Sequence, residues 1–188
     1  MRKVILQEFV SADGFAADAE GKVDYVPASM SGDKSFGDRQ LDFIDSVDTM
    51  LLGRVTYEMF VAYWPNVKSG EDKQFAGKVN ATPKVVFSTT LGRAPWGDWD
   101  NARIVRTNAV EEIRKLKAQP GKDMVLWGSI SLAQSLMDAD QIDEYQLIVC
   151  PLVFGRGRQL FRGPSKMKLL KSRSFDGGAV LLSYSRAK

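Results

Sequence analysis

The sequence predicts an α/β fold in which a mostly parallel central sheet ends in an antiparallel C-terminal hairpin. Short apolar runs typical of strands alternate with segments whose apolar residues recur at helical spacing. Such alternation implies helical crossovers between parallel strands. The last two strand-like runs flank Asp176-Gly177-Gly178, a sequence typical of a tight hairpin turn. The 188 residues contain no internal repeat or linker, so we expect one domain, residues 1–188.

The N-terminal part of the chain predicts a strand, a loop, a helix and a second strand, in that order. Residues 4–10 are apolar enough for a first strand, which the turn Ser11-Ala12-Asp13-Gly14-Phe15 ends. Residues 16–34 are polar, contain glycine and are expected to form a long loop. The apolar spacing over residues 36–47 predicts a helix, and the short apolar run over residues 49–53 predicts a buried strand.

Helices and strands continue to alternate up to the C-terminus. The remaining helices are expected over residues 55–64, 71–79, 109–117 and 130–137. The remaining strands are expected over residues 84–88, 102–105, 123–127, 141–149, 168–175 and 179–185. Pro65 and Pro120 end two of the helices, because proline cannot donate a backbone hydrogen bond inside a helix.

The charge and the hydropathy of the chain exclude several classes of partner. Its 26 basic and 23 acidic residues give a net charge of +3, and the charges are scattered. So small an excess does not predict a nucleic-acid partner. No apolar run approaches the ~20 residues that span a bilayer, and no signal-peptide core follows Met1-Arg2-Lys3. We therefore expect a cytoplasmic protein without a membrane partner.

The cysteine and histidine content narrows the chemistry further. Cys150 is the only cysteine, so no intrachain disulfide can form, and its apolar neighbours indicate a core residue. The sequence contains no histidine. Catalysis of the Ser-His-Asp or Cys-His type and the usual zinc sites are thereby excluded, and we expect no bound metal.

The predicted strand-to-helix turn Gly53-Arg54-Val55-Thr56 fits a phosphate. An open α/β sheet binds ligands beyond the carboxyl ends of its strands, and a helix N-terminus offers unpaired N–H groups there. Gly53 would let a phosphate approach the backbone, the Arg54 guanidinium would pair with it, and the Thr56 hydroxyl would donate a hydrogen bond. The alternative is a plain helix cap with a surface arginine.

Two further strand ends carry small or hydroxyl residues. The turn Gly128-Ser129, followed by Ile130, would cradle the other side of a pyrophosphate, or it is an ordinary tight turn. Ser88 and Thr89 would contact an adenosine ribose or its 2′-phosphate, or they are plain loop residues. Neither the GxGxxG pattern nor the GxxxxGK[ST] pattern is present, so the sequence supports neither a Rossmann site nor a P-loop.

One helix and one strand end offer candidates for contact with a substrate. Asp38, Asp42 and Asp45 are spaced four and three residues apart on the helix expected over residues 36–47. A buried aspartate there would protonate a bound heterocycle, because burial raises its pKa, while the alternative is a solvent-facing row of acids. Trp127 ends a predicted strand at the expected crevice and is a candidate substrate contact.

Five short motifs resemble known reductases. The segment Leu51-Leu52-Gly53-Arg54-Val55-Thr56-Tyr57-Glu58 resembles the glycine-arginine-x-threonine segment of dihydrofolate reductases. The other four resemble the reductase domain of the bacterial riboflavin-biosynthesis deaminase/reductase. They are Ser11-Ala12-Asp13-Gly14-Phe15, Val125-Leu126-Trp127-Gly128-Ser129, Asp143-Glu144 and residues 151–161. They follow one another in the order that the family shows, and the resemblance runs from about Lys3 to Ser185.

The resemblance implies a dihydrofolate-reductase-like three-layer αβα fold, NADPH as hydride donor, a small pteridine- or 5-amino-6-ribosylaminouracil-like substrate, and a homodimer. It implies that the cofactor phosphates and nicotinamide side are held by Gly53, Arg54, Thr56, Gly128, Ser129 and Ile130, and the adenosine end by Ser88. It implies that the nicotinamide and substrate are bordered by Val10, Asp13, Gly14 and Phe15. Asp38 is the nearest candidate for the catalytic acid.

This sequence departs from the family in two ways. The family usually shows Gly-Gly where this chain has Gly128-Ser129, and the zinc deaminase domain with its histidine and cysteine ligands is absent. Two other functions therefore stay open beside an NADPH-dependent reductase. One is a non-catalytic nucleotide-binding protein that retains the reductase fold, and the other is a flavin-dependent oxidoreductase that uses the same crevice.

Overall fold

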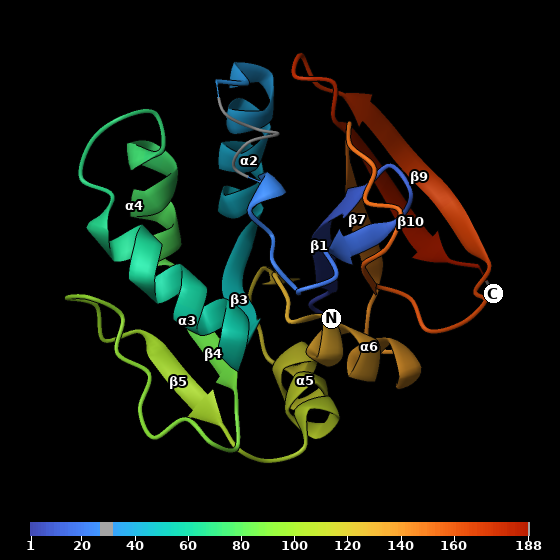
Figure 1. The fold of residues 1–188 in the computed structure, drawn as a ribbon. Helices are drawn as coiled ribbons and strands as arrows, with labels where there is room; N and C mark the ends of the chain where they lie inside the picture. The colour runs from blue at the N-terminus through green and yellow to red at the C-terminus, as the bar shows by residue number, and fades with distance from the viewer. Residues whose placement is uncertain (27–31, 188) are drawn as a thin grey trace.

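The computed structural model describes residues 1–26 and 32–187 (Figure 1). Its strands are β1 (Val4–Ser11), β2 (Phe15–Ala17), β3 (Val47–Gly53), β4 (Lys84–Phe87), β5 (Ala102–Val105), β6 (Asp123–Leu126), β7 (Glu144–Cys150), β8 (Arg158–Gln159), β9 (Met167–Ser174) and β10 (Val180–Arg186). Its helices are α2 (Lys34–Ser46), α3 (Arg54–Tyr63), the 3-10 helix η1 (Trp64–Asn66), α4 (Lys73–Ala81), α5 (Ala109–Ala118) and α6 (Ile130–Asp138).

Eight strands form one sheet in the order β5-β4-β3-β6-β1-β7-β10-β9. The first six run parallel to one another, while β10 is antiparallel to both β7 and β9. The predicted fold class, a mostly parallel sheet with an antiparallel C-terminal hairpin, is confirmed. Because the parallel strands all end at the same edge, the turns that follow β1, β3, β4 and β6 lie along that edge.

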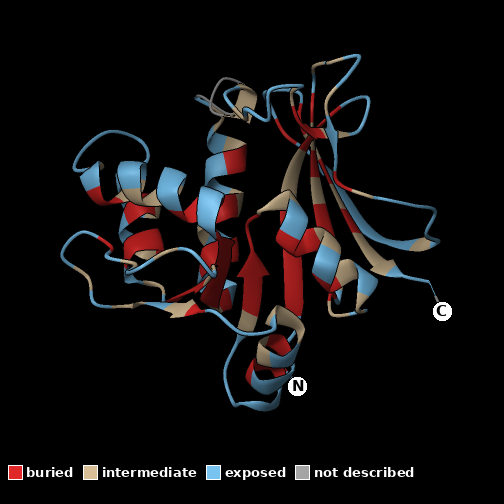
Figure 2. Ribbon diagram, turned by 60° about the horizontal axis from the view of Figure 1, so that its bottom comes forward, coloured by how far each residue is buried: buried red, intermediate tan, exposed pale blue. Residues whose placement is uncertain are grey.

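Helices cover both faces of the sheet, so the fold has three layers (Figure 1). On one face α2, α3 and α4 pack through core residues such as Phe43, Tyr57 and Val79. On the other face α5 and α6 pack through Ile113 and Leu136. Figure 2 shows the buried residues concentrated in the central strands and on the inner sides of these helices. Among the described residues, no helix is both long enough and apolar enough to cross a bilayer.

The segment expected to be one long loop over residues 16–34 contains regular structure instead. β2 pairs with β8 in a separate two-stranded sheet, in the register Phe15 with Gln159. Strands of three and two residues are too short to show a period of two, so the sequence gives no signal for them. α2 begins at Lys34 because the Asp33 side chain accepts a hydrogen bond from the Phe36 amide, 2.9 Å away, and caps the helix. Residues 27–31 of the expected loop lie outside the described residues.

A buried amide network joins α2 to the sheet. Gln7 of β1 donates from Nε2 to Gln40 Oε1 (3.2 Å) and Gln146 Oε1 (3.0 Å). Its Oε1 accepts from Gln40 Nε2 and from Trp127 Nε1, both 2.9 Å away. The Gln7 side chain thus uses both of its hydrogens and both of its lone pairs. A buried polar group is tolerated only with such partners, so the network fixes α2 against β1 and β7.

Lys84 is a buried cation at the start of β4. Lys84 is 1% exposed, and its Nζ donates to the Asn80 carbonyl (2.6 Å) and to Asn101 Oδ1 (3.3 Å). The ammonium lies 4.2 Å from the centroid of the Trp96 ring. No carboxylate pairs with it among the described residues. Burial therefore lowers the pKa of Lys84 from 10.5 to about 7.

This pKa predicts how stability depends on pH. Between about 7 and 10.5 the unfolded chain holds the Lys84 proton that the folded chain has released, so stability rises with pH across this window. We expect Lys84→Met to remove that rise and to be more stable than wild type at about pH 6.5, with the advantage shrinking towards about pH 9.5. Urea unfolding checks this, with the exposed Lys115→Met as the control for loss of a positive charge. Parallel pH profiles of wild type and Lys84→Met would contradict it.

Candidate active site

Two strand-to-helix turns meet at the carboxyl edge of the sheet. β3 enters α3 at Gly53, and β6 enters α6 through Gly128 and Ser129. The Gly53 amide donates to the Gly128 carbonyl at 3.1 Å, which ties the two turns together. The N-termini of α3 and α6 are therefore held side by side.

The two glycines make this close approach possible. A Cβ at Gly53 would overlap the Ser129 hydroxyl and lie 2.9 Å from Ser129 Cβ. A Cβ at Gly128 would lie 2.7 Å from Thr56 Oγ1, and Gly128 has a φ of +70°, a conformation that other residues rarely adopt. The Gly128–Ser129 peptide bond is cis. The space beside Gly53 is thus filled by Ser129, so the contact between the two turns requires a glycine at this position.

The start of α3 lacks the groups that normally satisfy a helix N-terminus. Its N-cap, Gly53, has no side chain to accept from the first amides, and no acidic residue lies in the first turn. Thr56 is mostly buried as a residue, but its hydroxyl stays accessible and makes no hydrogen bond within the described part of the chain. Unpaired N–H groups and the helix dipole leave a partial positive charge at Arg54, Val55 and Thr56. This arrangement suits an anion such as a phosphate.

Arg54 points along the surface of α3 and pairs with Glu58. Its Nη1 lies 3.0 and 2.9 Å from the two carboxylate oxygens, and both side chains are nearly half exposed. An exposed pair one helical turn apart contributes only about 0.3–0.5 kcal/mol. A doubly charged phosphate at the helix N-terminus can therefore compete with Glu58 for the guanidinium.

The other predicted cofactor residues lie at the same edge and carry local structural roles. Ser129 caps α6 by accepting from the Leu132 amide at 3.4 Å, and Ile130 begins the helix. The Ser88 hydroxyl oxygen accepts from the amides of Thr90 and Leu91, at 3.2 and 3.0 Å. Thr89 is exposed. The Ser88 hydroxyl keeps its hydrogen for a further acceptor, whereas the Ser129 hydroxyl also shares a hydrogen bond of 3.1 Å with the Ser131 hydroxyl.

β1 and β6 diverge before β1 ends. Their ladder stops at Leu6 opposite Leu126, whereas the ladder between β1 and β7 continues to Ser11 opposite Cys150. Beyond Leu126 the chain turns towards β3, because the Trp127 amide donates to the Leu51 carbonyl at 3.3 Å. Within the described chain, residues 7–11 of β1 therefore have no strand partner on the side of β6. We call this the open edge of β1.

Glu8 lies at this open edge and was missed by sequence reasoning. Its Oε2 is buried and has no hydrogen-bond partner within the part of the chain that the structure describes. Burial raises the pKa of Glu8 from 4.5 to about 8, against a smaller opposing effect of the Phe9 amide. The available signal was that Glu8 is the one charged residue in an otherwise uncharged strand, Val4–Ser11.

The turn that follows β1 holds two segments together. Asp13 accepts hydrogen bonds from the Ser11 hydroxyl (2.6 Å) and from the amides of Phe154 (3.2 Å) and Gly155 (2.7 Å). The Ser11 hydrogen bond is the main reason that the pKa of Asp13 lies below its ordinary value. Gly14 turns the chain at a φ of +88°, and Phe15 begins β2. Asp13, Gly14 and Phe15 thus form the turn at the end of β1, close in sequence to the buried Val10.

Two of the predicted residues have partners of their own within the described chain. Asp38 is exposed on the outer face of α2 and pairs with Lys34 at 2.7 Å, because Phe36 and Gln40 on either side of it face the core. Trp127 is 8% exposed and packs in the core on the α2 side. Its indole N–H is already bound to Gln7. Asp38 is thus held in an exposed ion pair and Trp127 in the core.

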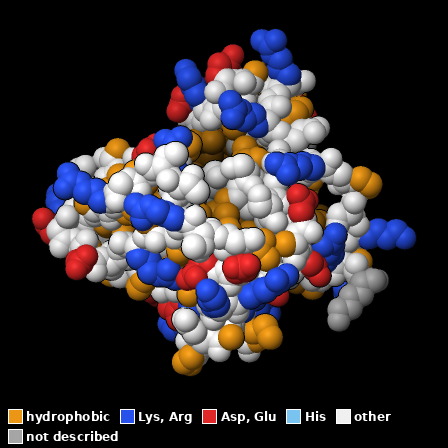
Figure 3. All heavy atoms as spheres, turned by 90° about the horizontal axis from the view of Figure 1, so that it is seen from below, with side chains coloured by type: hydrophobic (Ala, Val, Ile, Leu, Met, Phe, Trp, Pro, Cys, Tyr) orange, Lys and Arg blue, Asp and Glu red, His pale blue; other side chains and the backbone are white. Residues whose placement is uncertain are grey.

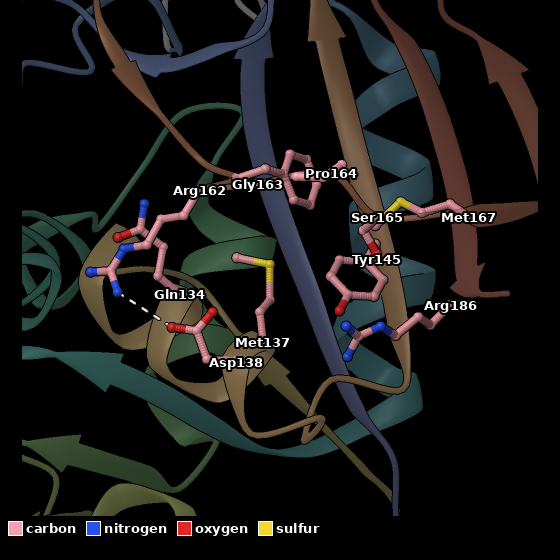
Figure 4. A pocket seen from close by; sticks show the side chains of 11 residues that line it. Gln134, Met137, Asp138, Tyr145, Arg162, Gly163, Pro164, Ser165, Met167 and Arg186 are labelled. Carbon is pink, nitrogen blue, oxygen red and sulfur yellow. Dashed lines mark hydrogen bonds and ion pairs between the residues drawn. The ribbon is translucent and has the colours of Figure 1, made fainter. Parts of the chain in front are cut away.

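A cavity of about 260 Å³ lies at the opposite end of α6 from Ser129 (Figure 4). Its lining includes Tyr145, Arg162 and Arg186, and the figure shows Asp138 pairing with Arg162 across the rim. The sequence predicted nothing there. On the face shown in Figure 3, Lys and Arg side chains are interspersed with Asp and Glu rather than gathered in one patch.

Comparisons with known proteins identify relatives of the whole chain. The model of the family described as the RibD C-terminal domain matches residues 2–181. The uncharacterized protein YyaP of Bacillus subtilis (strain 168) is 33% identical over 188 residues, which cover 97% of this chain and 94% of that protein.

Solved structures share the fold at low sequence identity. A putative riboflavin biosynthesis protein of Shewanella sp. PV-4 has a TM-score of 0.75 at 22% identity, and each chain is covered completely. The diaminohydroxyphosphoribosylaminopyrimidine deaminase/5-amino-6-(5-phosphoribosylamino)uracil reductase of Thermotoga maritima has a TM-score of 0.69 at 16% identity, over 99% of this chain and 57% of that one. Dihydrofolate reductase of Enterococcus faecalis, complexed with NADP(H), has a TM-score of 0.63 at 12% identity, over 99% of this chain and 97% of that one. The expected dihydrofolate-reductase-like fold is confirmed.

The contact between the two turns predicts a coupling between Gly53 and Ser129. We expect Gly53→Ala to lower the free energy of unfolding by about 1–3 kcal/mol, because its Cβ overlaps Ser129. Ser129→Gly should cost only a few tenths of a kcal/mol by itself and should restore most of the loss in the double variant.

Urea unfolding of the four proteins measures this coupling. Gly37→Ala serves as the control, because a Cβ at Gly37, within α2, meets nothing within 4 Å. Purely additive effects of Gly53→Ala and Ser129→Gly would show that the two turns do not contact each other in this way.

Proposed function

The chain belongs to the RibD C-terminal domain family, and from this premise we propose that it is an NADPH-dependent reductase of a small heterocycle. The substrate is of the pteridine or 5-amino-6-ribosylaminouracil type. The observation that carries the proposal is the pair of adjacent helix N-termini at Gly53 and Gly128. There the first turn of α3 has neither a capping side chain nor an acidic residue.

The residues at this edge fit a dinucleotide. The amides and the Thr56 hydroxyl at the start of α3, with the Arg54 guanidinium, would hold the phosphates. The Ser129 and Ile130 end of α6 would flank the pyrophosphate, and Ser88 and Thr89 after β4 would meet the adenosine end. When bound, NADPH supplies the hydride, so the protein's task is to orient the two molecules and to exclude water.

The non-catalytic alternative has one observation in its favour, which is that Asp38 is exposed and paired with Lys34. A protein that binds NADPH but never oxidises it with a pterin or a ribosylaminouracil would fit this alternative. Steady oxidation with either substrate would exclude it. We also propose that the protein acts as a cytoplasmic homodimer, with the half-exposed Leu169 and Leu170 of β9 against the second copy.

Cofactor binding can be tested at Arg54. We expect Arg54→Ala to weaken NADPH binding by roughly tenfold, because a charged hydrogen bond to phosphate contributes about 1.5 kcal/mol. If Arg54 reaches the 2′-phosphate, the same substitution should weaken NADH binding less than NADPH binding. Isothermal titration measures both constants, and Arg162→Ala, at the far end of α6, is the matched control with unchanged affinity.

The same titration can overturn the proposal. Wild-type protein that shows no heat of binding up to about millimolar NADPH is not an NADPH enzyme, since typical KM values lie between about 1 μM and 1 mM. If Arg54→Ala and Arg162→Ala lose equal affinity for NADPH, the binding site does not lie at the N-terminus of α3.

A further inference from the structure

One carboxyl oxygen is buried at the open edge of β1 without a partner among the described residues. Glu8 Oε2 has neither a hydrogen-bond donor nor a cation beside it among the described residues. Desolvating an isolated carboxylate is far more costly than protonating it, so such a group is held neutral. A protonated carboxyl has one O–H to donate, and the structure itself provides no acceptor for it.

The position of Glu8 in the sheet directs it towards the place where β1 and β6 separate. Glu8 is two residues beyond Leu6, the last residue of β1 that pairs with β6. Gly128 is likewise two residues beyond Leu126, the partner of Leu6. Side chains alternate along a strand, so Glu8 shares its face of the sheet with Leu6 and Val10. Along the strand direction, Glu8 is thus at the same height as Gly128, and it is two residues before Val10 on the same face of the sheet.

Tyr25 closes the open edge of β1 next to Glu8. Its hydroxyl lies 2.9 Å from the Phe9 carbonyl and 3.2 Å from the Ala16 carbonyl, and its ring packs edge-on against Phe154. The pKa of the Tyr25 hydroxyl is raised first by burial and then by the nearby charges of Glu8 and Cys150. Tyr25 is thus a titratable neighbour of Glu8, and no Lys or Arg of the described chain pairs with Glu8. The surroundings of Glu8 therefore favour its neutral, proton-donating form.

We propose that Glu8 is the acid of this site and protonates the nitrogen of a C=N bond that is reduced in the bound substrate. This assignment rests on the proposed reductase function and replaces Asp38 in that role. Reduction by hydride converts the C=N π bond into a C–H bond and leaves an electron pair on nitrogen. The proton of Glu8 Oε2 goes to that pair and forms the N–H bond. Glu8 becomes a carboxylate and takes a proton from water before the next turnover.

The assignment predicts how stability depends on pH, independently of activity. The unfolded chain releases the Glu8 proton near pH 4.5, whereas the folded chain keeps it up to about 8. Wild-type stability therefore falls as pH rises through this window, because the folded state holds the extra proton. We expect Glu8→Gln, whose amide resembles the protonated acid, to remove this fall and to exceed wild type in its urea midpoint at about pH 8.

The catalytic test compares Glu8→Gln with Asp38→Asn, because each removes one acid from a different place. We expect Glu8→Gln to lower turnover by at least ~100-fold while its dissociation constant for NADPH changes by less than about threefold. Asp38→Asn should keep the wild-type turnover and the wild-type dissociation constant for NADPH. Glu8→Asp should restore part of the turnover, because it restores a carboxyl on a shorter side chain.

The outcomes separate this assignment from the function on which it rests. Wild-type turnover in Glu8→Gln, or its loss in Asp38→Asn, overturns the role of Glu8 and leaves the reductase standing. A Glu8→Gln protein whose stability profile matches wild type between about pH 5 and 8 also overturns it. Wild type that fails to bind NADPH overturns the reductase function first and the assignment with it.

Discussion

The contact between two strand ends governs the rest of this site. β3 and β6 are neighbours in a parallel sheet, and each runs directly into a helix. The helices can begin side by side only because Gly53 and Gly128 have no Cβ where Ser129 and Thr56 pack. Two helix N-termini then present their unpaired amides at one point of the sheet edge. The anion binding that we propose for this edge rests on backbone geometry, and the side chains of Arg54, Ser88 and Ser129 would add to it.

Two buried ionisable groups lie near opposite ends of the strands and have different consequences. Lys84, at the start of β4, is satisfied by Asn80, Asn101 and the Trp96 ring. It has partners for its donors and needs no ligand. Glu8, towards the carboxyl end of β1, has a buried oxygen that finds no partner among residues 1–26 and 32–187. The same physical cause, burial, therefore lowers the pKa of a lysine that the structure satisfies and raises the pKa of a carboxyl that it leaves unpaired, the acid that we propose.

Much of the fold could be predicted from the sequence, because apolar periodicity and turn residues mark each long element. The Asp176-Gly177-Gly178 turn and the glycine after β3 are examples. β2 and β8 could not be predicted, since strands of three and two residues have no visible period. The acid was placed on α2 because spacing suggested a helix face, but periodicity cannot tell which face is buried. Asp38 faces solvent, whereas Glu8 has a buried carboxyl oxygen, which only the three-dimensional arrangement reveals.

The central claim is that a dinucleotide binds where the turns at Gly53 and Gly128 meet, with Glu8 beside it. Backbone amide spectra of isotope-labelled protein, recorded during titration with NADPH, test this most directly, because they locate the ligand without requiring turnover. The account predicts that the largest shifts fall on Gly53 to Thr56 and on Gly128 to Ile130, with smaller shifts at Glu8 and its neighbours in β1. Shifts centred on the cavity at Tyr145 and Arg162, with these turns unchanged, would contradict it.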